Sequence, residues 1–136
     1  MNPLTLGDRT LTELDHVRLS SLLRRLDAAA DSPLDECLAS ADLVPSRQVG
    51  PDVVTMYSQL QLVDAATGRR RTLTLCYPAD AEPDAGFVSV LSPVGAALLG
   101  RRVGSRASWV TPDGRRHEAE IVAVLFQPEA SGDYTT

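Results

Sequence analysis

Four acidic residues lie within ten positions in the N-terminal part of the chain: Asp27, Asp31, Asp35 and Glu36. Carboxylate oxygens are the ligands that a hard cation such as Mg²⁺ prefers, and a protein commonly supplies one or two of them. A structural role fits the same residues, because Asp31 and Asp35 lie where side chains cap helices and Asp27 would be solvated. The spacing leaves both roles open and favours the structural one.

A second pattern begins at Ser92-Pro93, directly after the apolar run FVSVL at residues 87–91. Ser92 can accept hydrogen bonds from the backbone N–H groups two and three residues on, and Pro93 suits the first position of a helix. Val94 then begins an apolar stripe, and Gly100 supplies the left-handed residue that ends the helix. We expect a short helix whose exposed N-terminus has spare N–H donors for an acidic or carbonyl-rich partner.

Three short runs of arginine lie at or beside predicted turns. Arginine side chains at loop tips make bidentate contacts with carboxylates or phosphates, although solvated turns explain the same pattern. A nucleic-acid surface would usually interleave aromatic side chains for base stacking, and none accompany these runs. A protein partner is therefore favoured. The runs are Arg69-Arg70-Arg71, Arg101-Arg102 and Arg115-Arg116.

Charge and composition argue against several classes of protein. The 136 residues carry a net charge of −5, whereas a protein that coats nucleic acid has a basic surplus, so we expect no sequence-specific nucleic-acid binding. No apolar run approaches the length of about 20 residues that spans a bilayer, and the N-terminal segment lacks the basic start and apolar core of a signal peptide. We therefore expect a cytoplasmic protein, and we expect it to be a monomer.

Residue types that support catalysis or metal binding are sparse. Cys37 and Cys76 lie far apart without a CxxC motif, and we expect free, buried and inert thiols. His16 and His117 are isolated, which is typical of ordinary surface or helix histidines. The sequence has no glycine-rich phosphate loop, no Ser/His/Asp order and no Cys/His metal spacing. It therefore predicts a protein without enzymatic activity and without a cofactor.

Two amphipathic helices should position the acidic residues. Leucines recur at helical spacing in residues 11–30, with Thr10 or Thr12 as the cap, and Ser32-Pro33 begins a second helix over residues 33–43. Because the turn between them is short, we expect an antiparallel hairpin, a short coiled coil within residues 1–46. The second helix would be about 16 Å long at a rise of about 1.5 Å per residue.

Residues 51–136 have the alternating pattern of strands and form the second predicted domain. With the helix that starts at Pro93, they predict an antiparallel sheet of about five strands crossed by one short helix. The fold class is therefore α+β, with a boundary among the prolines and glycine of residues 44–52. We expect the run at 87–91 to be buried on both faces. The extended segments are residues 53–57, 60–63, 71–77, 87–91, 107–110 and 117–126.

Several blocks of the sequence resemble a known family. The run SVLSPVGAALLG at residues 89–100, with RVG at residues 102–104, resembles the C-terminal domain of the bacterial Gre transcript-cleavage factors. The stretch from PDVVTMYSQLQL at residues 51–62 to QPEASGDY at residues 127–134 is similar to a smaller branch, the regulators of nucleoside diphosphate kinase. The resemblance implies that the predicted sheet has an FKBP-like α+β fold.

The same resemblance implies a transcription regulator that binds RNA polymerase near its secondary channel. In the Gre factors, acidic residues at the tip of a long helical finger enter that channel and help to hold a catalytic Mg²⁺. The finger predicted here is far shorter and does not match that tip residue for residue, which implies competition with Gre factors without transcript cleavage. By this resemblance the anchoring residues are Ser92, Pro93, Val94, Arg101 and Arg102.

Two other functions stay open. An FKBP-like fold raises prolyl isomerase activity, although the chain has few aromatic side chains from which to build the apolar pocket of such an enzyme. The family name implies a link to nucleoside diphosphate kinase, by direct contact or through transcription.

Overall fold

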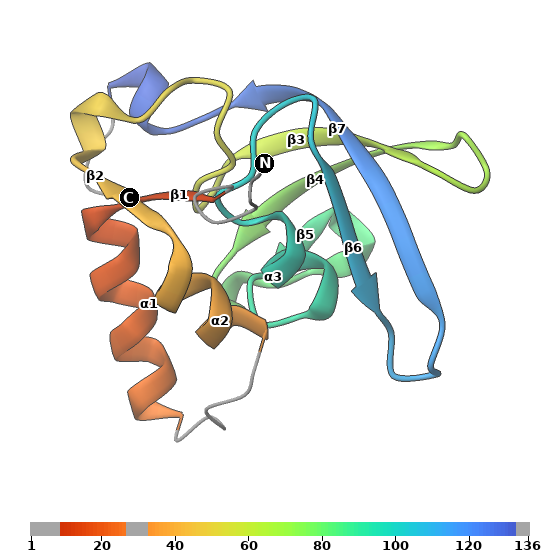
Figure 1. Ribbon diagram of the computed structural model, residues 1–136, viewed down its shortest axis with the longest axis horizontal. Coiled ribbons are helices and arrows are strands. Elements are labelled where there is room, and N and C mark those ends of the chain that lie inside the picture. The colour runs from red at the N-terminus through yellow and green to blue at the C-terminus, as the bar shows by residue number, and fades with distance from the viewer. Residues whose placement is uncertain (1–8, 27–32, 133–136) are drawn as a thin grey trace.

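The first part of the structure combines two short strands with two helices, and we refer to it as the N-terminal unit (Figure 1). The computed structural model describes residues 9–26 and 33–132, and the N-terminal unit ends at Val44. The two strands pair in parallel, which brings the start and the end of the unit side by side. The elements are β1 (Thr10–Thr12), α1 (Glu13–Arg25), α2 (Pro33–Ser40) and β2 (Asp42–Val44).

Helix α1 begins at Glu13 rather than at Leu11, so the predicted start of this helix was wrong. Leu11 is buried and pairs with Leu43 of β2, a partner that is distant in the sequence. Thr12 stays extended, and its hydroxyl accepts a hydrogen bond from the Asp15 backbone N–H at 3.0 Å. This cap fixes the start of the helix and confirms Thr12 as one of the two predicted caps.

Helix α2 is also shorter than predicted, because it ends at Ser40 and the chain then enters β2. At eight residues it is about 12 Å long. Leu34 and Leu38 are buried as expected, and the His16 ring nitrogen Nε2 lies 3.0 Å from the Leu38 carbonyl oxygen, which joins α1 to α2. The connection between the helices falls at residues 27–32, outside the described residues, so the antiparallel hairpin stays a prediction.

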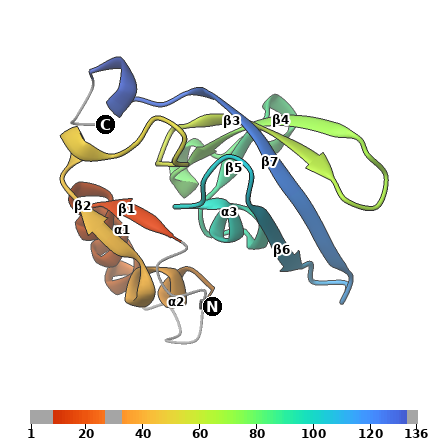
Figure 2. The ribbon, with the colours of Figure 1, turned by 45° about the horizontal axis from the view of Figure 1, so that its top comes forward.

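A five-stranded sheet forms the larger part of the molecule, in the order β5-β4-β3-β7-β6. Figure 2 shows the sheet curling around helix α3, with the N-terminal unit on the other side of that helix. Shifts in the pairing register between β3 and β7 contribute to this curl. The elements are β3 (Gln59–Asp64), β4 (Arg70–Cys76), β5 (Phe87–Ser89), α3 (Pro93–Leu98), β6 (Arg106–Val110) and β7 (Arg116–Phe126). The prediction of about five strands and one short helix is confirmed.

Three details of the predicted sheet were wrong. Strand β5 runs parallel to β4, with Thr74 opposite Phe87, so the sheet is mixed rather than antiparallel. Only one face of β5 is fully buried, because Val88 is 5% exposed whereas Phe87, which points to the opposite face, is 37% exposed. Residues 53–57 are not a strand, although the segment is buried and Val53 makes one isolated bridge to Arg102.

Helix α3 has the ends that the sequence predicts. The Ser92 hydroxyl accepts from the Gly95 backbone N–H at 3.1 Å, Pro93 occupies the first turn, and Gly100 has a φ of +80°. Gly95 lies against β5 so closely that a Cβ atom there would be 2.1 Å from the Ser89 carbonyl oxygen. Such contact between two backbones requires a residue without a side chain.

Buried side chains from both parts form one continuous core. Leu19 and Leu34 of the N-terminal unit belong to the same cluster as Leu60 and Leu75 of the sheet. The cluster is aliphatic, as the composition predicts. Cys37 and Cys76 are free and buried, which confirms that expectation. Within the described ranges, no helix is long and apolar enough to cross a membrane.

Candidate protein-binding cleft

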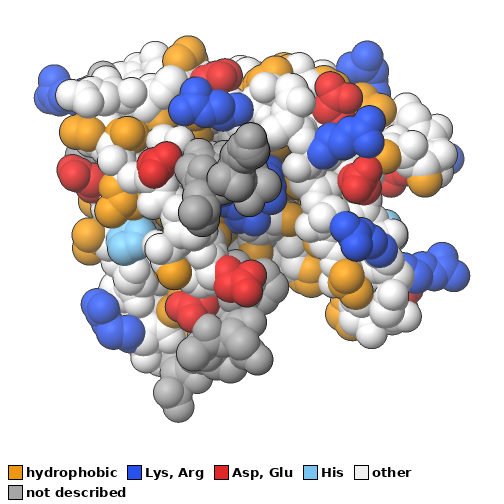
Figure 3. Space-filling view, viewed as in Figure 1, with side chains coloured by type: hydrophobic (Ala, Val, Ile, Leu, Met, Phe, Trp, Pro, Cys, Tyr) orange, Lys and Arg blue, Asp and Glu red, His pale blue; other side chains and the backbone are white. Residues whose placement is uncertain are grey.

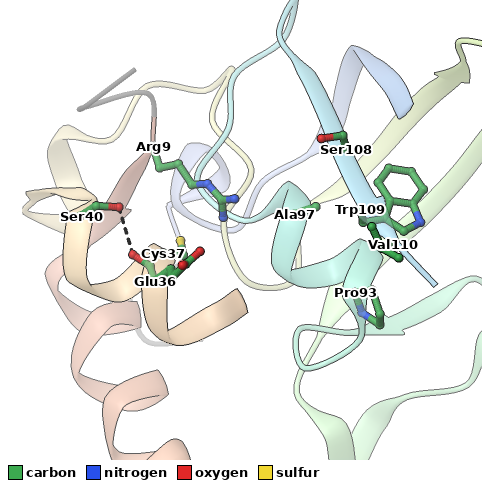
Figure 4. Close-up of a pocket in the computed structure, with 9 residues that line it drawn as sticks. All are labelled: Arg9, Glu36, Cys37, Ser40, Pro93, Ala97, Ser108, Trp109 and Val110. Carbon is green, nitrogen blue, oxygen red and sulfur yellow. Dashed lines mark hydrogen bonds between the residues drawn. The ribbon is translucent and has the colours of Figure 1, made fainter. Parts of the chain in front are cut away.

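A cleft of about 420 Å³ lies between α2, α3 and the edge strand β6 (Figure 4). One wall comes from the N-terminal unit and the other from the sheet and its helix, so residues far apart in the sequence face each other. The cleft is lined by Arg9, Glu36, Cys37, Ser40, Pro93, Ala97, Ser108, Trp109 and Val110.

The wall next to the N-terminal unit carries opposite charges. Arg9 extends toward α3, where its Nη1 donates to the Ala96 carbonyl oxygen at 2.6 Å and also lies 3.4 Å from the Leu99 carbonyl oxygen. Glu36 is exposed on α2, and in the described part of the chain its carboxylate has no ion-pair partner. This wall can therefore offer a guanidinium and a free carboxylate to a polar ligand.

The opposite wall is largely apolar. Pro93 and Ala97 of α3 lie beside Trp109 and Val110 of β6, and Val110 is 57% exposed. The Trp109 ring stacks on His117, with ring centroids 5.8 Å apart and planes 15° apart, which fixes the indole in place. A rigid aromatic beside exposed aliphatic groups is typical of protein-recognition surfaces.

Strand β6 also presents free backbone groups at this edge of the sheet. Thr111 donates to Arg115 at 2.9 Å and Ile121 donates to Ser105 at 3.0 Å across the β6–β7 pair. Hydrogen-bonded pairs alternate along antiparallel strands, so the N–H and C=O groups of Ser108 and Val110 point away from β7, toward the open edge. An extended segment of a partner could pair with these groups.

Cys37 lies at the base of the cleft but is not suited to nucleophilic chemistry. Its Sγ is buried and lies 3.9 Å from the Leu99 carbonyl oxygen. Burial raises the pKa of the Cys37 thiol above its ordinary value, despite the nearby Arg9 and Arg101 guanidinium groups. The thiolate, which is the reactive form, is therefore disfavoured.

The structure brings only part of the predicted site together. Pro93 and Glu36, predicted as an anchoring residue and a finger-tip residue, both line the cleft. Ser92 is occupied by capping, since its hydroxyl also donates to the Ser89 carbonyl oxygen at 2.7 Å. Val94 is half-buried against the core, and Asp35 is half-buried on α2. Asp27 and Asp31 lie outside the described residues.

Arg101 and Arg102 each contact another part of the protein, although Arg102 is exposed. The Arg101 Nε donates to the Ala97 carbonyl oxygen at 2.8 Å, which caps the C-terminal end of α3. The Arg102 Nη2 lies 3.4 Å from the Thr10 hydroxyl of β1. These contacts give both arginines a structural role alongside the predicted anchoring role.

Sequence reasoning did not select Arg9, Ser108, Trp109 or Val110 as site residues. Trp109 is the only tryptophan, and a lone tryptophan in a short strand was the one local signal available. Arg9 precedes all predicted elements, and its contact with Ala96 joins residues 87 positions apart. No local pattern reveals such a contact.

A buried carboxyl group joins α1 to the segment before β3. Asp15 is 1% exposed, and its Oδ2 accepts from the Met56 backbone N–H at 3.2 Å. Burial raises the pKa of Asp15 to about 7, and the nearby Glu129 carboxylate acts in the same direction. No local pattern in the sequence indicated this burial.

Metal ligands do not gather in the described residues. No group of three His, Cys, Asp or Glu side chains there could hold a metal ion. The described residues of the cleft offer hydrogen-bonding groups, charges and apolar side chains.

Comparison with known proteins gives a consistent result. Residues 48–126 match the family described as "Transcription elongation factor, GreA/GreB, C-term". A regulator of nucleoside diphosphate kinase from Escherichia coli (strain K12) is 38% identical over 129 residues, which cover 91% of this chain and 93% of that protein. A transcription elongation factor GreA from Azorhizobium caulinodans is 30% identical over 116 residues, covering 85% of this chain and 73% of its own length.

A solved structure supports the same relationship. The prokaryotic transcription elongation factor GreA/GreB from Nitrosomonas europaea superimposes with a TM-score of 0.72 and 34% sequence identity. The superposition covers 88% of this chain and 98% of that structure. The helices and curled sheet described above are therefore shared by the two proteins.

Proposed function

Because this chain belongs to the GreA/GreB family of transcription elongation factors, we propose that it is a non-enzymatic regulator that binds RNA polymerase near the secondary channel. It would compete there with Gre factors without stimulating transcript cleavage. The named relatives are transcription elongation factors and a regulator, which supports a regulatory role. A polymerase partner would place the protein in the bacterial cytoplasm.

The shortness of α2 carries this proposal. The eight residues of α2 span only about 12 Å. The 13 residues of α1 span about 20 Å. Acidic residues on such helices, including Asp35 and Glu36, would enter the channel only partway. The same holds for Asp27 and Asp31 if they lie at the finger tip. We infer that the finger occupies the channel mouth but delivers no metal to the catalytic centre.

In this proposal the two domains have different roles. Residues 1–46 would form the short finger, a helical hairpin, and residues 51–136 would form an FKBP-like anchoring domain. The anchoring surface would include the cleft, because Pro93 lies there next to Trp109 and the free edge of β6. This surface would be supported at the start of α3 by Ser92 and Val94. Beyond the end of α3 it would be supported by Arg101 and Arg102.

A second candidate function is regulation of nucleoside diphosphate kinase. The relative from Escherichia coli, 38% identical, carries this function in its name. Direct contact with the kinase would use the same cleft, whereas an effect through transcription would need only polymerase binding. A pull-down with purified polymerase and purified kinase distinguishes direct contact from an effect through transcription, because only direct contact predicts capture of the kinase.

The test is a transcript-cleavage assay on backtracked polymerase complexes. The protein alone should leave the transcript intact, and increasing amounts should reduce the cleavage stimulated by a Gre factor. Val110→Asp should weaken the competition, because it places a charge in the apolar wall of the cleft at a position that is 57% exposed. Leu125→Asp is the matched control, since Leu125 is 51% exposed on β7, outside both the cleft and the finger. Cleavage stimulated by the protein itself, abolished by Asp35→Asn with Glu36→Gln, would overturn the proposal.

A further inference from the structure

Two of the three arginine runs lie at the same end of the sheet. Arg69, Arg70 and Arg71 follow the turn between β3 and β4, and Arg115 and Arg116 follow the turn between β6 and β7. Figures 1 and 2 both show these hairpins projecting from the same side of the molecule, away from the N-terminal unit. We call this surface, residues 64–71 and 111–118, the hairpin end.

The turn between β3 and β4 is held by local hydrogen bonds. The Asp64 Oδ1 accepts from the backbone N–H groups of Ala66 at 2.8 Å and Thr67 at 3.0 Å. Gly68, with a φ of +72°, closes the turn, and its N–H donates to the Asp64 carbonyl oxygen at 2.8 Å. The backbone that carries the first arginine run is therefore fixed before any partner binds.

The turn between β6 and β7 is fixed in a similar way. The Asp113 Oδ1 accepts from the Arg115 backbone N–H at 3.1 Å and from the Thr111 hydroxyl. The Ala65 backbone N–H donates to the Glu118 carbonyl oxygen at 2.9 Å, which ties the two hairpins together. A preorganised surface loses little conformational freedom on binding.

Most of these arginines lack a counter-charge. In the described ranges, Arg115 lies 3.7 Å from Asp113, whereas no carboxylate lies within 4.0 Å of Arg69, Arg70, Arg71 or Arg116. All five arginines are exposed. The hairpin end holds five arginines against three carboxylates, so it is positive on a protein whose net charge is −5.

A notch of about 350 Å³ separates the two hairpins. Figure 3 shows arginine side chains along this edge of the molecule, with acidic side chains between them. A ligand that enters the notch would meet the Arg116 guanidinium between the carboxylates of Asp64 and Glu118, and the other arginines of the hairpin end lie outside the notch. The lining residues are Asp64, Ala65, Ala66, Arg116, His117 and Glu118.

We propose that the hairpin end binds an acidic segment of a partner protein, separately from the cleft that serves the proposed function. Discrete side-chain carboxylates can pair bidentately with individual arginines while avoiding Asp64, Asp113 and Glu118. A nucleic acid would bring a continuous line of phosphates past those carboxylates and past a protein of net negative charge. The nearest aromatic rings, Trp109 and His117, are half-buried and stacked on each other, so they offer bases no open platform.

The test measures binding of a fluorescein-labelled polyglutamate peptide by fluorescence anisotropy at low ionic strength. Arg70→Ala with Arg116→Ala removes one arginine from each hairpin and should weaken binding about tenfold or more. Arg24→Ala with Arg25→Ala is the matched control, because it removes the same charge from exposed positions on α1. That control should change the affinity about twofold or less, through net charge alone.

Two further measurements decide between the occupants. Arg70→Lys with Arg116→Lys keeps the charge and should retain part of the affinity, because lysine cannot bind a carboxylate bidentately. An oligouridylate with the same number of charges should bind more weakly than the peptide. The proposal is overturned if the wild-type protein does not bind the peptide, if both alanine pairs lose affinity equally, or if the RNA binds more tightly. Circular dichroism of each variant ensures that binding is compared between folded proteins.

Discussion

Helices α1 and α3 both pack against the centre of the molecule, but the two contacts have opposite chemistry. Helix α3 meets the backbone of β5 through Gly95, where a Cβ atom would be 2.1 Å from the Ser89 carbonyl oxygen. Helix α1 meets the segment before β3 through the buried carboxyl group of Asp15, which accepts from the Met56 backbone N–H. The contact of α3 leaves no space for a larger side chain at Gly95. The contact of α1 depends on whether the Asp15 carboxyl group is protonated.

This difference determines which change disturbs each contact. Space at Gly95 is bounded by backbone atoms of Ser89 and Val90, which cannot move without shifting β5. Asp15 instead has one buried oxygen, Oδ1, without a hydrogen-bond partner in the described residues, so its charged form is poorly compensated. We therefore expect α3 to be sensitive to volume and insensitive to pH, and α1 to show the reverse.

The largest effect should come from Gly95→Ala. The added methyl group overlaps the Ser89 carbonyl group, so α3 must move away from β5 and lose its packing. The free energy of unfolding should fall by more than about 3 kcal/mol. Urea unfolding followed by circular dichroism measures this change.

Gly104→Ala is the matched control for this substitution. Gly104 has a φ of +93°, and a Cβ atom there would meet no described atom within 4 Å beyond its chain neighbours, so only backbone strain opposes the alanine. That strain is worth about 1 kcal/mol. If Gly95→Ala is no more destabilising than Gly104→Ala, the contact between α3 and β5 is looser than its geometry indicates.

The α3 region was predictable because its signals are local. Ser92, Pro93 and Gly100 define the two ends of a helix by their own backbone preferences, whatever surrounds them. The strands of the sheet were found for a similar reason, since alternating side chains and turn residues are recognised within a few positions. The parallel pairing of β5 with β4 was missed because strand direction depends on the path of the chain between them.

The N-terminal unit was less predictable because distant pairing sets its boundaries. Leu11 fits the helical stripe of α1 equally well, and only its pairing with Leu43 places it in a strand. The cleft was missed for the same reason, since Arg9 and Trp109 are far apart in the sequence and line one cleft only in the folded protein. Burial of Asp15 likewise depends on the segment that covers it.

The second prediction concerns pH and the α1 contact. In the folded protein the pKa of Asp15 is about 7, against an ordinary value of 3.8. Between these values the folded state keeps a proton that the unfolded state has released, so the stability contributed by this group is full below pH 4 and is lost as pH rises to 7. From about pH 5 to about pH 8 the wild type should lose about 2–3 kcal/mol relative to Asp15→Asn.

Urea unfolding of the wild type and of Asp15→Asn at several pH values tests this prediction. Asparagine is the suitable replacement because it keeps an acceptor for the Met56 N–H and cannot ionise. Asp113→Asn is the control of opposite sign. Hydrogen bonds from Thr111 and from the Arg115 backbone N–H lower the pKa of Asp113, so any stability it contributes is lost as pH falls. Parallel pH profiles for the wild type and Asp15→Asn would contradict the assignment of the pH dependence to α1.

The smallest effect should come from the arginines that cap the C-terminal end of α3. Arg9 and Arg101 donate to the Ala96 and Ala97 carbonyl oxygens, at 2.6 Å and 2.8 Å. Arg9→Ala and Arg101→Ala should each lower the free energy of unfolding by about 1 kcal/mol, because each removes charge-assisted hydrogen bonding to the end of α3 at a partly exposed site. The losses in unfolding free energy should not add up in the double variant, since both arginines bind the same end of α3.

The same two arginines also separate structural support from polymerase anchoring. If Arg101 contacts polymerase directly as well as supporting α3, Arg101→Ala should reduce competition with a Gre factor more than Arg9→Lys does, even where the two variants lose similar stability. Arg9→Lys is the comparison because it keeps a positive charge beside the cleft while it disturbs the hydrogen bond to α3. Equal losses in both measurements would mean that Arg101 acts only by holding α3.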